Sequence, residues 1–160
     1  MVCNDGQGRY TGRLVRGALN YYDAMERMRF IVPGYGWSVE VFMPARSLNV
    51  SEIMAAMNRI GASYTNKRTA YEAMMREEFN CGLTVSNNNS RASVMVVGVA
   101  SSAMEFYDSL RHEETHLAMH IAEACKIDER SEEFAYLVGD IGRVIFPTAK
   151  KYLCDHCRSK

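Results

Sequence analysis

The sequence has no apolar run long enough to cross a membrane. A transmembrane helix needs about 20 consecutive apolar residues, whereas the apolar stretches of these 160 residues are short and broken by charged side chains. The first 12 residues also lack the basic segment and apolar core of a secretory signal. We therefore expect a cytoplasmic protein that has no membrane partner.

An excess of positive charge is also missing. The chain has 19 Lys and Arg residues against 19 Asp and Glu residues, which gives a formal net charge of zero. Proteins that bind DNA or RNA along a broad surface usually carry a basic face. The composition therefore predicts no nucleic-acid partner.

The five cysteines are too few and too scattered to form a disulfide framework or a four-cysteine metal site. In a chain without an export signal, reduced thiols are the default state. Cys154 and Cys157 form one CxxC pair, but a structural zinc site needs four ligands and the sequence has no second pair. We interpret residues 148–160 as a basic, cysteine-containing tail.

The hydrophobic pattern predicts a single α+β domain over residues 1–160, with no internal repeat and no low-complexity linker. Residues 1–80 are expected to form a helical and strand-containing N-terminal part. Its predicted elements are a helix over 13–28, a half-buried strand over 37–43, a helix from Asn49 or Ser51 to about Ile60, and a helix from Thr65 or Asn66 to about Phe79.

Residues 82–147 are expected to form the core of the functional site. Strands over 83–86 and 93–100, joined by an Asn-rich turn, have the pattern of a buried hairpin. Ser101 or Ser102 then begins a long helix, with Glu105 placed to complete a capping box from Ser102. A last helix is predicted from Asp128 or Ser131 to about Val144, before Pro147.

The long helix carries the motif His112-Glu113-Glu114-Thr115-His116, which has the HExxH form. Residues four apart lie one turn apart on the same helix face, so both imidazoles can reach one ion. Zinc binds neutral imidazole well and can keep a position for water. Glu113 follows the first ligand and is placed to take a proton from that water. The motif predicts zinc bound by His112 and His116, with Glu113 as the catalytic base.

The third ligand is open to several residues. His120 lies two turns from His112, roughly 12 Å along the helix axis, so one ion cannot bind both, although a His116 and His120 pair is geometrically possible. Glu132 and Glu133 open the next helix and could each supply a carboxylate. We rank Glu132 first, ahead of Glu133 and Asp140. If the long helix runs straight to Cys125, however, Asp140 would lie nearer the level of the metal, unless the two helices cross steeply.

Tyr136 is a second candidate for a catalytic role. It lies one turn after Glu132 and is predicted to share its helix face, from which its hydroxyl could donate to a developing oxyanion. The simpler interpretation is a half-buried aromatic side chain.

From Gly82 to Cys157 the sequence resembles a family of small zincin-like metallopeptidases encoded by bacterial prophages and mobile elements. More distantly, the HExxH helix followed by Glu-x-x-Ala resembles the gluzincin peptidases. The matching segments are Gly82 to Ser86, the Val-rich strand with Gly98, Ser101 to Phe106, His112 to Ile121, Glu132 to Leu137, Gly139 to Ile141, Phe146-Pro147 and Cys154-x-x-Cys157.

The resemblance implies a zincin-like α+β fold, with a small antiparallel or mixed sheet, an HExxH helix and a following helix that bears a ligand. It implies Zn²⁺ held by His112, His116 and Glu132, with Glu113 as the base. We therefore expect a zinc-dependent metallopeptidase that hydrolyses a peptide or protein substrate. The alternative is a non-catalytic interaction protein of a phage or mobile element, in which zinc stabilises the fold.

Overall fold

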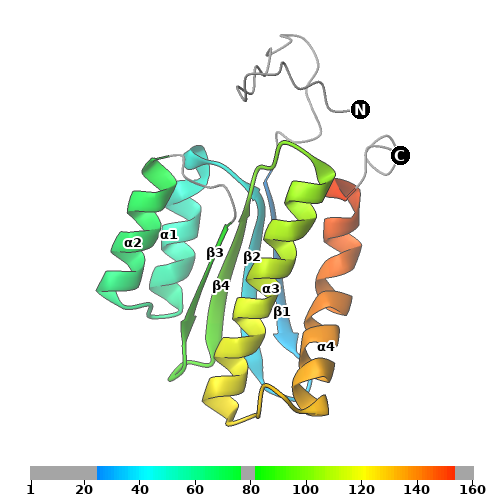
Figure 1. The fold of residues 1–160 in the computed structure, drawn as a ribbon. Helices are drawn as coiled ribbons and strands as arrows, with labels where there is room; N and C mark the ends of the chain where they lie inside the picture. Colours follow the sequence, from blue (N-terminus) through cyan, green and yellow to red (C-terminus); the bar gives the residue numbers. More distant parts are fainter. Residues whose placement is uncertain (1–24, 77–81, 154–160) are drawn as a thin grey trace.

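The computed structural model describes residues 25–76 and 82–153, which form a four-stranded sheet with helices on both faces (Figure 1). The strands are β1 (Glu26–Val32), β2 (Trp37–Ala45), β3 (Gly82–Asn87) and β4 (Ala92–Gly98). The main helices are α1 (Val50–Arg59), α2 (Tyr64–Met75), α3 (Ala103–Cys125) and α4 (Glu132–Ala149), and the short 3₁₀ helices η1 (Ser47–Asn49) and η2 (Lys150–Tyr152) complete the described elements.

The sheet has the strand order β1-β2-β4-β3 and is mixed. β1 pairs with β2 and β3 pairs with β4 in antiparallel fashion, whereas the central pair, β2 and β4, is parallel. The expected α+β fold with a small mixed sheet is therefore confirmed, and so is the hairpin formed by β3 and β4.

Two apolar layers hold the helices against the sheet. One lies between the sheet and the pair α3 and α4, and it includes Trp37, Val41, Phe106 and Leu137. The other lies between the sheet and the pair α1 and α2, and it includes Phe42. Figure 1 shows α3 and α4 side by side on one face and α1 with α2 on the other.

The predicted helix over 13–28 is wrong in its described part. Residues 1–24 lie outside the described residues, but Glu26, Arg27 and Met28 belong to β1. In β1, exposed and half-buried residues alternate from Glu26 to Ile31, which is the period of a strand that is covered on one face. The methionines at 25 and 28 fit a helical interval, but the two-residue alternation that continues to Ile31 decides the conformation.

The strand predicted over 37–43 is confirmed as β2, but the expectation that it is half-buried is wrong. Among its nine residues only Ser38 is exposed. β2 is a central strand, and helices pack against both faces of the sheet. Its polar residues therefore do not mark a side that faces solvent.

The helix boundaries follow from local capping residues. α1 begins after Asn49 and is followed by Gly61 at a φ of 71°, as predicted. α2 begins one or two residues earlier than expected, because the Ser63 hydroxyl accepts the Asn66 N–H at 3.1 Å. α2 ends at Met75 with Arg76 as its C-cap, which is earlier than the predicted end at about Phe79.

The last two helices are both long. The sequence left open whether α3 ends early or runs to Cys125, and it predicted that α4 ends near Val144. α3 runs without a break to Cys125 and ends at Lys126, which has a φ of 60°. α4 starts at the Ser131 cap and continues past Val144 through Pro147 to Ala149. Within the described part of the chain, no helix combines the length and apolar character that a membrane span requires.

Candidate metal centre

The two histidines of the HExxH motif converge on one point outside α3. The Nε2 atoms of His112 and His116 are 3.0 Å apart, and their rings meet edge to face with centroids 4.6 Å apart. Two ligands of a tetrahedral zinc ion, each about 2.0–2.1 Å from the metal, are roughly 3.3 Å apart. The spacing of the two nitrogens is therefore close to that of a ligand pair, and both side chains are exposed to solvent.

Glu113 lies beside this pair but is buried, with only 2% of its surface exposed. Its Oε2 accepts a hydrogen bond of 2.7 Å from the Thr84 hydroxyl of β3. Burial raises the pKa of the Glu113 carboxyl, and the Thr84 hydrogen bond and the nearby imidazoles of His112 and His116 act in the opposite direction. The site thus has a carboxylate that holds its proton more strongly than an exposed glutamate.

The start of β3 gives Glu113 the room it occupies. Gly82 has a φ of 142°, and a Cβ at this position would lie 2.9 Å from the Glu113 Cγ and 2.4 Å from the Val96 carbonyl oxygen. A larger residue therefore cannot occupy position 82 without moving the backbone or the Glu113 side chain.

His120 belongs to a separate hydrogen-bonded chain that enters the core. Its Nδ1 is 2.8 Å from the Ser86 Oγ, which is 2.7 Å from the Ser93 Oγ, and Ser93 accepts the indole N–H of Trp37 at 2.8 Å. An indole only donates, so every donor is used when Ser93 donates to Ser86 and Ser86 donates to His120. This direction leaves Nδ1 of His120 as an acceptor and its proton on Nε2.

The hydrogen bonds of His120 argue against His116 and His120 as the pair of metal ligands. The two rings are 6.2 Å apart between centroids, and Nδ1 of His120 faces Ser86. Burial and the neighbouring His116 both lower the pKa of His120. The described contacts therefore give His120 a neutral, inward-facing role, and they leave His112 as the partner of His116.

The predicted residues on α4 are not brought together with this pair. On an α-helix, residues two apart lie about 160° apart around the axis, and Glu114 faces α4, where a Cβ on Gly142 would lie 3.9 Å from its Oε2. His112 and His116 are each two residues from Glu114, so they point away from α4. Among residues 25–76 and 82–153, no group of three or more His, Cys, Asp or Glu side chains is arranged to hold a metal ion.

Each of the α4 candidates therefore lies apart from the motif. Glu132 is exposed, Glu133 lies 3.4 Å from the Tyr35 hydroxyl, and Asp140 forms an ion pair with Arg143. Tyr136 has 70% of its surface exposed and is not the half-buried aromatic of the simpler interpretation. α3 runs to Cys125, the case in which the sequence placed Asp140 nearer the metal level than Glu132, yet Asp140 is not brought together with the pair either.

The sequence reasoning missed the residues that surround the motif from the sheet. Thr84 and Ser86 alternate with Leu83 and Val85, so a strand places the two hydroxyls on one face. That alternation was a usable signal for a polar face, but it does not say which helix covers it. The hydroxyl-bearing face is the one that contacts α3.

Comparisons with protein-family models, with curated proteins and with solved structures give no match for this chain.

Proposed function

We propose that the protein is a zinc-dependent metallopeptidase with a zincin-like site, in which His112 and His116 bind the metal and Glu113 is the catalytic base. The observation that carries the proposal is the convergence of the two Nε2 atoms at 3.0 Å beside a buried carboxylate. The donor set fits zinc, because neutral imidazole nitrogen is a preferred ligand. A zinc ion, when bound, acts as a Lewis acid toward a carbonyl and lowers the pKa of water.

The residues of this chain have separate parts in such a reaction. Glu113 can accept a proton, and its burial makes it a stronger base than an exposed glutamate. Thr84 fixes the carboxylate by its hydrogen bond and keeps it beside the histidines. The exposed histidine pair leaves the site accessible to a peptide or protein from solvent.

Glu132 stays the proposed third ligand on the grounds of sequence, and Tyr136 stays a proposed donor to the oxyanion. The geometry gives neither of them support, because α4 lies on the opposite flank of α3 from the histidine pair. The proposal for Glu113, His112 and His116 does not depend on either residue.

The test is peptide hydrolysis by zinc-loaded protein and its Glu113→Gln variant. The amide cannot accept the proton, so we expect zinc content to be unchanged and hydrolysis to fall by about 10²-fold or more. Glu123→Gln, an exposed residue on the same helix, is the matched control and should retain activity.

Two other outcomes lead elsewhere. Hydrolysis that survives in Glu113→Gln removes this residue from the mechanism. Stoichiometric zinc without hydrolysis of any peptide in a broad library favours the non-catalytic, zinc-stabilised protein instead.

A further inference from the structure

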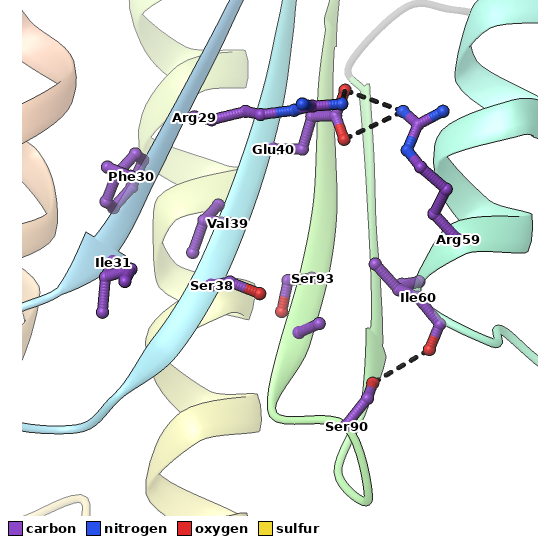
Figure 2. Close-up of a pocket in the computed structure, with 11 residues that line it drawn as sticks. Arg29, Phe30, Ile31, Ser38, Val39, Glu40, Arg59, Ile60, Ser90 and Ser93 are labelled. Atoms are coloured by element: carbon purple, nitrogen blue, oxygen red, sulfur yellow. Dashed lines mark hydrogen bonds and ion pairs between the residues drawn. The ribbon is translucent and has the colours of Figure 1, made fainter.

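Three arginines surround one buried glutamate on the face of the sheet opposite the histidine pair. Glu40 of β2 has 7% of its surface exposed. Its Oε1 lies 3.3 Å from Nη2 of Arg29 and 3.0 Å from Nη2 of Arg59, and Arg27 forms a further ion pair with the same oxygen. Figure 2 shows Arg29 and Arg59 approaching the carboxylate from β1 and α1.

This cluster has more positive charge than Glu40 can neutralise. Three guanidinium groups against one carboxylate leave an excess of two positive charges. The nitrogens of Arg29 and Arg59 that share Oε1 lie within about 6 Å of each other, a distance at which like charges repel. One arginine would be enough to neutralise the buried carboxylate, so the other two provide unused capacity for a second anion.

The arginines lie at a groove that no described helix covers. α1 and α2 pack over β3, β4 and part of β2, and among residues 25–76 and 82–153 no other helix lies on this face of the sheet. The groove has a volume of about 540 Å³ and extends from Arg29 across Ser38 to Ser90, with apolar side chains along it. Ile31 is among them and has 66% of its surface exposed.

The groove fits carboxylates better than phosphate. Phosphate sites commonly use backbone N–H groups at the start of a helix, whereas this groove meets the end of α1, which is the negative end of its dipole. The carbonyl of Ile60 there accepts the hydroxyl of Ser90 at 2.9 Å. The negative end of a helix dipole disfavours a doubly charged phosphate more than a carboxylate, which carries a single charge. A carboxylate can also take a paired contact from a guanidinium group. Aliphatic side chains of a ligand can pack between Ile31 and Ile60.

We propose that this groove binds an acidic peptide segment of a partner protein, with carboxylates on Arg29 and Arg59 and aliphatic side chains along Ile31 and Ile60. Glu40 neutralises part of this charge in the free protein, and the carboxylates of the peptide compete with it for Arg29 and Arg59. The groove and the histidine pair lie on opposite faces of the sheet, so this inference is independent of the metallopeptidase proposal.

The experiment is a calorimetric titration of the metal-free protein with a blocked peptide of alternating Glu and Val residues. The same peptide with Gln in place of Glu, and inorganic phosphate, are titrated in parallel. We expect the acidic peptide to bind, its affinity to fall as salt is added, and the Gln peptide to bind at least about tenfold more weakly.

Substitutions locate the binding. Arg29→Gln and Arg59→Gln should each weaken binding by about tenfold, because each removes a charged donor, while Glu40 keeps two arginine partners and the fold is retained. Arg143→Gln, whose ion pair with Asp140 lies on α4, is the matched control and should bind as the parent does. Glu40→Gln removes the competing carboxylate and, in folded protein, should strengthen binding, which a purely structural role for Glu40 does not predict.

Four results would overturn the inference. They are the absence of peptide binding, equal binding of the Gln peptide, unchanged binding in Arg29→Gln and Arg59→Gln, and phosphate binding tighter than that of the acidic peptide. The last result would make the cluster a phosphate site.

Discussion

Glu113 couples the stability of the fold to pH through a single carboxyl group. Its folded-state pKa is raised by burial, so the folded chain holds this proton more tightly than the unfolded chain does. The free energy of unfolding therefore falls as pH rises from the ordinary carboxyl pKa through the raised value, and the lost stability is not recovered above it. The burial that makes Glu113 a stronger base therefore also lowers the free energy of unfolding when its carboxyl is ionised.

This gives a prediction for metal-free Glu113→Gln. The amide has no charge to bury and can still accept the Thr84 hydroxyl, so the variant should be more stable than the parent at neutral pH. The difference should shrink as pH falls through the raised pKa. Urea unfolding at a series of pH values measures it, and a constant difference would contradict the assignment. Glu129→Gln, an exposed residue, should show no such dependence.

Gly82 and Gly139 form a second test at the scale of single residues. Gly82→Ala places a Cβ 2.4 Å from a backbone oxygen at a left-handed φ, so we expect a loss of about 2 kcal/mol or more in the free energy of unfolding. Gly139→Ala in α4 meets nothing within 4 Å and should be neutral or stabilising by up to about 1 kcal/mol. Chemical denaturation of both variants decides the matter, and equal effects would show that Gly82 is not sterically required.

The sequence could place the histidine pair because its geometry is local. The spacing of His112 and His116 implies their convergence once the segment is helical, and Glu113 follows in the same turn. The contacts of Glu113 with Thr84 and Gly82 come from a strand about 30 residues earlier, so no local period indicates them. The prediction of Glu132 as the third ligand gained no support from the structure for a similar reason. It depended on which side of α3 packs against α4, and this is a tertiary feature that no local period indicates.

Secondary-structure elements show the same division between local and tertiary causes. The capping serines of α3 and α4, Ser102 and Ser131, were among the predicted start residues because their hydroxyls act within one turn. The end of α4 was predicted too early. Pro147 costs the helix a hydrogen bond, but continuing it buries Ile145 and Ala149 completely, and that burial is not visible in the local sequence.

The start of α3 is tested by Ser102→Ala. The Ser102 hydroxyl accepts the Glu105 N–H at 3.1 Å, and the Glu105 carboxylate accepts the N–H and hydroxyl of Ser101 rather than closing the predicted box on Ser102. Loss of the cap should lower the free energy of unfolding by about 1 kcal/mol. Ser101→Ala removes only a hydroxyl contact to Glu105 and leaves the backbone one, so it should cost less. Thermal unfolding of the two variants compares them, and the reverse order would contradict this account of the cap.

At the scale of the whole molecule, the sheet separates two surfaces of different chemistry. The histidine pair and Glu113 lie with α3 on one face, and the arginine cluster around Glu40 lies on the other. The chain as a whole carries no net charge, so the basic character of the groove is a local concentration that composition could not predict. Binding at one surface can therefore be measured while the other is altered.

Zinc should stabilise the whole fold if His112 and His116 bind it. A ligand that binds only the folded state at about 100 times its Kd adds about 2.7 kcal/mol, which for a chain of this size raises the Tm by roughly 5–10 °C. His116→Ala should abolish the zinc-dependent rise. His120→Ala should keep it, even if the starting Tm falls, because His120 bonds Ser86 and is not directed at the pair. Thermal unfolding with zinc and with a chelator provides both values for each variant. Loss of the rise in His120→Ala would replace His112 by His120 in the site, and loss of the rise in Glu132→Gln would make Glu132 a ligand despite its position on α4.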